Sequence, residues 1–251
     1  MSTWQFQTRQ FLLPKSGHQL SECEDAIGIN LSARRFAIAD GATEAFDSQS
    51  WARLLAHDWV SPGPADQSVD EFRAWVARQG HLLHDSWSGL RLSWYAEEKA
   101  RTGSFAAFVG LQIDVEGTAP RWNVIALGDS CLIHCRNETI VTALPVSNYE
   151  SFNATPPLVP SHASMQQAAL EKVVSAAGVI EREDVLLLLS DAIAAWYLML
   201  VEKDAPAIAR FDLLLKSMDE PELQLLFEKD RLSGRIKDDD IAVVRIEVVQ
   251  E

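Results

Sequence analysis

The chain of 251 residues has an ordinary globular composition, with 47% hydrophobic and 23% charged side chains, which excludes a disordered, collagen-like or coiled-coil protein. A formal charge of −14 without a basic tract argues against nucleic-acid binding, because a phosphate backbone repels an acidic surface. The length suits one domain over residues 1–251, with a core large enough to fold without a metal or disulfide.

The cysteine content and the apolar runs predict a cytoplasmic protein. Cys23, Cys131 and Cys135 are a sparse, odd set, unlike the paired cysteines of a secreted domain. The first residues contain no apolar run that would suit a signal peptide. The longest apolar run, 185–201, is short for a bilayer span and carries Asp191 near its middle. We therefore expect no membrane contact.

The first part of the chain alternates between strand-like and helix-like periods. Apolar residues at every second position predict strands, and apolar residues at helical spacing predict helices that end at proline and glycine. The expected elements are strands at 4–8, 25–31 and 35–39, a helix from Glu44 to the Pro-Gly-Pro at 62–64, and a helix that Ser68 caps and that continues, with an interruption near Gly89, to Ala100.

The second part begins with four strand-like runs separated by turn residues, which together predict an antiparallel meander over 105–144. Four prolines predict an extended loop over 145–164, and 165–176 fits either helix or loop. The remaining pattern predicts a buried strand at 185–189, a helix from Asp191, helices at 205–217 and 220–232, and a last strand at 241–249. Strands at both ends and grouped helices favour an α+β fold built on antiparallel sheet.

Acidic residues recur where the expected strands begin or end. Hard divalent cations such as Mg²⁺ and Mn²⁺ prefer oxygen ligands, and two such ions about 3.5–4 Å apart activate water and clamp a phosphoryl group. Taken singly, each aspartate also fits an ordinary turn or helix cap. Taken together, they predict a metal centre at one edge of a sheet; the positions are Asp25, Asp40, Asp129, Asp191 and the triplet 238–240.

The order of these motifs resembles that of the metal-dependent protein phosphatases of the type 2C family, over about residues 4–249. The matching segments are ECEDAIGIN (22–30), RFAIADGATE (35–44), TGSFAAFVGLQI (102–113), IALGDSCLIHCRN (125–137), DVLLLLSDA (184–192) and KDDDIAVVRI (237–246). The resemblance implies two stacked antiparallel sheets flanked by helices, an α-β-β-α sandwich.

The same resemblance implies an activity and a ligand set. A metal-bound hydroxide would hydrolyse phosphoserine or phosphothreonine in a phosphorylated protein, in signalling, without a covalent intermediate on a side chain. Glu24 matches an acidic residue behind the metal ligands, and Asp129 matches one that helps to bind a third, weaker ion. Two Mg²⁺ or Mn²⁺ ions would be held by Asp25, Asp40, the carbonyl of Gly41, Asp191 and Asp239.

Two departures from the family pattern keep a second class of function open. Leu20 occupies the position at which many members carry an arginine that holds the substrate phosphate, and Lys15, His18 and Arg34 are candidate substitutes. Ala42 stands where some relatives have a histidine as general acid. The alternative function is a catalytically weak or inactive pseudophosphatase that acts as a binding or regulatory module.

The spacing Cys131-x-x-His134-Cys135 also raises the possibility of a zinc site. Successive side chains of a strand face opposite sides, so the two cysteines would face one way and His134 the other. Tetrahedral coordination needs convergent ligands. We therefore expect buried cysteines here and not a zinc ligand set.

Overall fold

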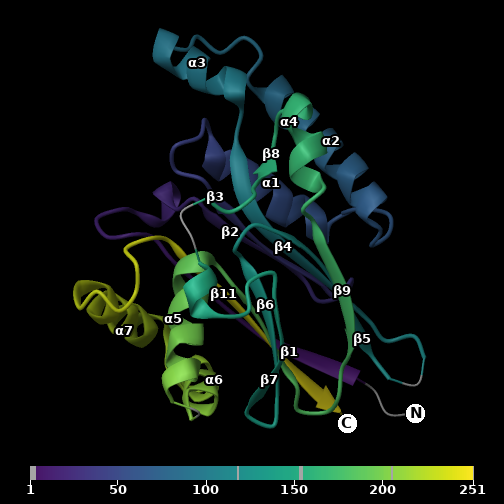
Figure 1. Ribbon diagram of the computed structural model, residues 1–251, viewed down its shortest axis with the longest axis vertical. Helices are drawn as coiled ribbons and strands as arrows, with labels where there is room; N and C mark the ends of the chain where they lie inside the picture. The colour runs from purple at the N-terminus through teal and green to yellow at the C-terminus, as the bar shows by residue number, and fades with distance from the viewer. Residues whose placement is uncertain (1–3, 118, 153–154, 205, 251) are drawn as a thin grey trace.

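Two antiparallel sheets stack face to face in the computed structural model, and helices cover the outer side of each sheet (Figure 1). Residues 4–117, 119–152, 155–204 and 206–250 are described. One apolar cluster lies between the two sheets. A second lies between the first sheet and its helices, and a third lies between the second sheet and its helices. The predicted α+β class and the α-β-β-α sandwich are confirmed.

The first sheet brings the two ends of the chain together. Its strand order is β1-β11-β10-β6-β7, and every neighbouring pair is antiparallel. In the pair β1 and β11, Leu13 lies opposite Ile241, so both terminal strands are fixed along their length. The strands are β1 (Trp4–Leu13), β6 (Cys131–Arg136), β7 (Thr139–Leu144), β10 (Val185–Leu189) and β11 (Ile241–Gln250).

The second sheet carries the first two acidic motifs on its edge hairpin. Its order is β2-β3-β4-β5-β9, and the short strand β8 also pairs with β4. The strands are β2 (Asp25–Asn30), β3 (Arg35–Gly41), β4 (Phe105–Asp114), β5 (Arg121–Leu127), β8 (Val159–Pro160) and β9 (Val174–Val179).

Two groups of helices form the outer layers (Figure 1). Ser68 caps α2 as predicted, because its hydroxyl accepts a hydrogen bond from the backbone N–H of Glu71 at 3.1 Å. Within the part of the chain that the structure describes, no helix combines the length and the apolar character that crossing a bilayer requires. On the side of the second sheet lie α1 (Ser48–Val60), α2 (Val69–Ser86) and α4 (Ala163–Leu170), and α3 (Trp94–Thr102) projects beyond the end of that sheet; on the first sheet lie α5 (Asp191–Lys203), α6 (Ala207–Ser217) and α7 (Glu220–Leu232).

The predicted meander over 105–144 is wrong at its centre. β4 and β5 pair in the second sheet and β6 and β7 in the first, so the chain crosses between the sheets at residues 128–130. Gly128 has φ +117, and an added Cβ would lie 2.4 Å from the Cβ of Ala107. This close approach to the neighbouring strand replaces the hairpin turn expected at Asp129-Ser130.

Smaller differences concern boundaries. The first helix begins at Ser48 and not at Glu44, because Asp47 adopts a left-handed conformation with φ 52 immediately before it. The region predicted as an extended loop includes a short 3-10 helix, η2 (Tyr149–Ser151), and β8. The segment that fits either helix or loop, 165–176, contains most of α4 and the first residues of β9. β9 is the edge strand of the second sheet and pairs with β5.

The expected arrangement of the cysteines and His134 is confirmed. Cys131 and Cys135 lie in the cluster beneath the helices of the first sheet, and all three cysteines are free thiols. His134 faces the other sheet, where its Nδ1 accepts a hydrogen bond from Trp122 Nε1 at 3.2 Å. Its Nε2 lies 2.8 Å from a carboxylate oxygen of Asp184. His134 therefore connects the two sheets and is not turned toward the cysteines.

Candidate metal centre

The predicted acidic residues come from both sheets and lie near one another at one end of the sandwich. Asp25 and Asp40 belong to β2 and β3, whereas Asp191 follows β10 and Asp239 precedes the neighbouring strand β11. After burial, the negative charges of the other four acidic positions, including Asp129, are the main influences that raise the pKa of Asp40. The fold thus places the other four acidic positions near enough for their charges to act on Asp40.

Asp25 and Asp40 lie directly opposite each other in the edge hairpin. They share the face of Ile27 and Ile38, which pack into the layer between the sheets. Like charges in such cross-strand pairs are destabilising. At about 5 Å and an effective dielectric constant near 20, two carboxylates repel by about 3 kcal/mol. The hairpin therefore favours a cation at this position.

Asp25 has the least compensated charge of the group. Its side chain is 3% exposed, and neither carboxylate oxygen has a hydrogen-bond partner among the described residues. Burial first, and then the nearby charge of Asp240, raise the pKa of Asp25 well above its usual value; the nearby Ser190 side chain, short of a full hydrogen bond, opposes this only in part. A buried carboxylate without a donor is costly, so a ligand that supplies positive charge would stabilise it strongly.

Asp129 is held in the crossover between the sheets, where its side chain is nearly buried. Burial, followed by the charge of Asp191, raises the pKa of Asp129 to about 7. The negative charge of Asp191 therefore acts on Asp129 in the folded protein.

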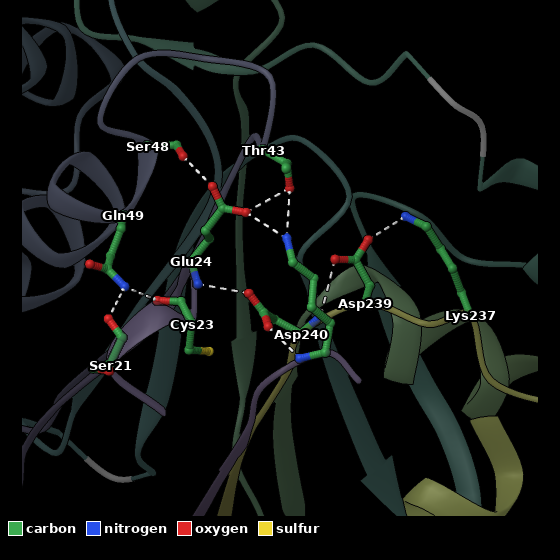
Figure 2. Close-up of polar contacts among 10 residues, drawn as sticks. Ser21, Cys23, Glu24, Thr43, Ser48, Gln49, Lys237, Asp239 and Asp240 are labelled. Atoms are coloured by element: carbon green, nitrogen blue, oxygen red, sulfur yellow. Dashed lines mark hydrogen bonds and ion pairs between the residues drawn. The ribbon is translucent and has the colours of Figure 1, made fainter. Parts of the chain in front are cut away.

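The half of the site on the first sheet is bridged by a lysine that the sequence analysis did not single out. The ammonium of Lys237 lies 2.7 Å from Asp239 Oδ2 and 3.0 Å from Asp191 Oδ2. Figure 2 shows its contact with Asp239. Partial burial opposes protonation, but the charges of these two carboxylates hold the pKa of Lys237 above its usual value, so the ammonium stays charged.

The carboxylate of Glu24 already has hydrogen-bond donors within the protein. Its oxygens accept hydrogen bonds from Ser48 Oγ at 2.6 Å, Thr43 Oγ1 at 2.6 Å and Lys15 Nζ at 2.9 Å (Figure 2). Burial opposes ionisation, but these three donors keep the pKa of Glu24 below its usual value. The side chain of Glu24 is thus held in place by these donors. The backbone carbonyl of the same residue accepts a hydrogen bond from the N–H of Gly41, 3.2 Å away.

Asp238 and Asp240 have a different role from Asp239. Asp240 is buried and accepts hydrogen bonds at 2.7 Å from the backbone N–H groups of Lys15 and Glu24 (Figure 2). Asp238 accepts one from the N–H of Ser16 at 2.9 Å. The two outer residues of the triplet thus tie the loop before β11 to the β1–β2 connection, and the middle residue faces Lys237.

The structure shows which of the candidate side chains could bind the substrate phosphate in place of the missing arginine. Leu20 lies in the short 3-10 helix η1 (Leu20–Glu22) and is 57% exposed. The ammonium of Lys15 is ion-paired with the carboxylate of Glu24, so its positive charge is already neutralised within the protein. Arg34 lies at the opposite end of the edge hairpin and donates to the carbonyl of Ile113 at 3.2 Å, which removes it as a candidate. His18 is exposed in the β1–β2 connection.

In the described part of the chain, no three His, Cys, Asp or Glu side chains converge closely enough to hold one ion. The donor chemistry nevertheless fits hard divalent cations, because carboxylates from the two sheets lie near enough to raise the pKa values of Asp25 and Asp40, and both oxygens of Asp25 lack a hydrogen-bond partner among the described residues. Gly41 is enclosed here: an added Cβ would lie 2.8 Å from the carbonyl oxygen of Ser48. The residues present therefore suit the ions that the motifs implied.

Comparisons with known proteins agree on the fold. No protein-family model matches the sequence, and no curated protein matches it. Among solved structures, the serine/threonine phosphatase Stp1 from Staphylococcus aureus is 14% identical with a TM-score of 0.64, over 96% of this chain and 94% of that chain.

Two further structures cover almost the whole chain. The catalytic domain of the phosphatase PstP, in complex with two manganese ions, is 14% identical with a TM-score of 0.60, over 98% of this chain and 100% of that one. PppA, described as a key regulatory component of the T6SS in Pseudomonas aeruginosa, is 17% identical with a TM-score of 0.59, over 99% and 100%. The chain therefore has the fold of the type 2C serine/threonine phosphatases, as the motifs implied.

Proposed function

We propose that the protein is a metal-dependent phosphatase that hydrolyses phosphoserine or phosphothreonine in a protein substrate. The observation that carries the proposal is the buried carboxylate of Asp25, which lacks a hydrogen-bond partner among the described residues and lies opposite Asp40. Such a pair is unfavourable in a protein that binds no cation there. The solved phosphatases with this fold, one of them in complex with two manganese ions, support the same assignment.

Each sheet would contribute two carboxylates. Asp25 and Asp40 would hold ions from the edge hairpin, with the carbonyl of Gly41, and Asp191 and Asp239 would complete the set from the first sheet. Two bound Mg²⁺ or Mn²⁺ ions would supply Lewis acidity, both to activate water and to neutralise the phosphoryl oxygens.

The surrounding residues would keep this arrangement in place. Glu24 would fix the start of β2 through its bonds to Ser48 and Thr43, and Asp240 would fix the β1–β2 connection through two backbone N–H groups. Asp129 would lie beside Asp191 as a site for a weaker third ion. Preorganised ligands lose little free energy on binding, which favours tight association.

The test is hydrolysis of a small aryl phosphate and of a phosphothreonine peptide, with Mn²⁺ and with chelator. We expect turnover that requires Mn²⁺ and falls by at least about 100-fold in Asp40→Asn, because one charged ligand is lost. Asp85→Asn, at an exposed position of α2, is the matched control and should retain full activity.

The same measurements separate the enzyme from the alternative, a pseudophosphatase that binds partners without turnover. That alternative is motivated by Leu20, which places no charge where many relatives of this fold carry an arginine. Absence of turnover in the unmodified protein, with Mn²⁺ binding still visible by calorimetry, would favour the binding module and reject the phosphatase.

A further inference from the structure

The two carboxylates on the first sheet are turned toward Lys237 in a specific way. Asp191 Oδ1 accepts the backbone N–H of Ala192 at 2.6 Å, and Asp239 Oδ1 accepts the N–H of Asp240 at 3.0 Å. The second oxygen of each carboxylate contacts the ammonium of Lys237, at 3.0 and 2.7 Å. Backbone donors therefore fix one oxygen of each residue, and the lysine occupies the other.

We propose that Lys237 is a tethered competitor of the metal: its ammonium occupies the cation position between Asp191 and Asp239 and must leave before a divalent ion can bind there. This inference rests on the proposed function, because it concerns the same site. It adds a control on metal binding that arises from this chain's own loop before β11.

The two halves of the site differ in a way that supports this role. On the second sheet, both oxygens of Asp25 are unpartnered, so an ion can approach that carboxylate without displacing a side chain. On the first sheet, the oxygens that an ion would need already contact a charged group. A divalent ion should therefore bind first beside Asp25, and the position between Asp191 and Asp239 should fill at higher metal concentration.

Displacement of the lysine is feasible because its own side chain is 63% exposed and can turn into solvent. The carboxylates that it bridges are only 16% and 29% exposed, so they need a cation more than the lysine needs them. A divalent ion carries twice the charge and accepts several oxygen ligands at once, whereas an ammonium offers three donors. The lysine should thus be a weak competitor that raises the required metal concentration without preventing binding.

The test compares Mn²⁺ binding to the full chain by titration calorimetry. Lys237→Met keeps the length of the side chain and removes its charge, and we expect its weaker Mn²⁺ site to bind about 3- to 10-fold more tightly than that of the unmodified protein. Lys237→Arg retains a cation and should bind Mn²⁺ with close to the unmodified affinity.

A matched control exists far from the site in α6. Lys216 also bridges two carboxylates, at 3.1 Å from Asp212 Oδ2 and 2.8 Å from Glu247 Oε1. Lys216→Met should leave Mn²⁺ affinity unchanged. In chelator, Lys237→Met should melt at a lower temperature than the unmodified protein, because Asp191 and Asp239 then lack a counter-charge. We therefore expect Lys237→Met to be less stable in chelator and to bind Mn²⁺ more tightly, and we expect the affinity change in no other variant.

Each outcome has a definite meaning. Equal or weaker Mn²⁺ binding by Lys237→Met would overturn the competitor role, while binding by the unmodified protein would leave the proposed metal centre intact. If neither protein binds Mn²⁺, both the competitor role and the proposed function are wrong. Tighter binding in both methionine variants would indicate a general effect of net charge and would also overturn the inference.

Discussion

Replacing Asp129 by asparagine should stabilise the metal-free protein, and the gain should depend on pH. The carboxyl of Asp129 is nearly buried, and burial together with the charge of Asp191 raises its pKa to about 7 from an ordinary 3.8. The folded protein therefore binds a proton at this group more tightly than the unfolded chain does. Stability linked to it is highest below the unfolded pKa and decreases as pH rises toward 7.

The magnitude follows from that difference. Each pKa unit corresponds to about 1.4 kcal/mol, so the ionised group costs at most about 4 kcal/mol above pH 7, and almost nothing near pH 4. Asparagine has nearly the same shape and no charge. Asp129→Asn should therefore raise the free energy of unfolding by up to about 4 kcal/mol at pH 8, and by little at pH 4.

Urea unfolding in chelator, at several pH values between 4 and 8, measures this difference. Asp70→Asn is a suitable control because the Asp70 side chain is 92% exposed, and it should change stability by no more than about 0.5 kcal/mol at any pH. A stabilisation of Asp129→Asn that does not vary with pH would refute the electrostatic reasoning, as would a variant less stable than the unmodified protein at pH 8.

Two further predictions concern the cation and the connection between the sheets. Mn²⁺ at about 100 times its dissociation constant should stabilise the protein by about 2.7 kcal/mol and raise the melting temperature by about 5–10 °C, and chelator should reverse the effect; an unmoved melting curve would contradict a metal centre. His134→Ala should cost about 2–4 kcal/mol in urea unfolding, because it leaves the buried Trp122 N–H without its acceptor across the sheets and removes one of several hydrogen bonds to Asp184. The control, exposed His81→Ala, should cost almost nothing, and equal stabilities of the two variants would reject this account.

Local patterns were sufficient to predict most elements of the fold. The helix at Glu220–Leu232 and the strand at Val185–Leu189 have the predicted bounds, because capping and turn residues mark their ends in the sequence. The edge hairpin was equally readable, since its turn separates two short apolar runs. Its register then places Asp25 opposite Asp40.

The crossing between the sheets could not be read from the same patterns. β5 is buried on both faces: Val124 lies in the cluster between the sheets and Ile125 in the cluster beneath the helices. Leu132 and Cys131 divide in the same way on β6. Alternating hydrophobicity cannot assign such strands to one sheet or the other, because neither face is polar.

The candidate site was predicted in its acidic residues but not in their partners. Aspartates at strand ends are visible in the sequence, whereas the bridging role of Lys237 depends on the path of the loop before β11. The division of labour within 238–240 depends equally on contacts with the β1–β2 connection. These contacts join segments more than 200 residues apart, and no local propensity encodes them.

The placement of two carboxylates on each sheet has a mechanical consequence. Each sheet is held by its own backbone ladder, whereas the distance between the Asp25–Asp40 pair and the Asp191–Asp239 pair depends on how the sheets sit against each other. A small rotation of one sheet over the other would change the spacing of the two pairs without breaking any strand pairing. The geometry of the site thus depends on how the two sheets are aligned, and the hydrogen bond from the N–H of Glu24 to Asp240 is one contact that fixes this alignment.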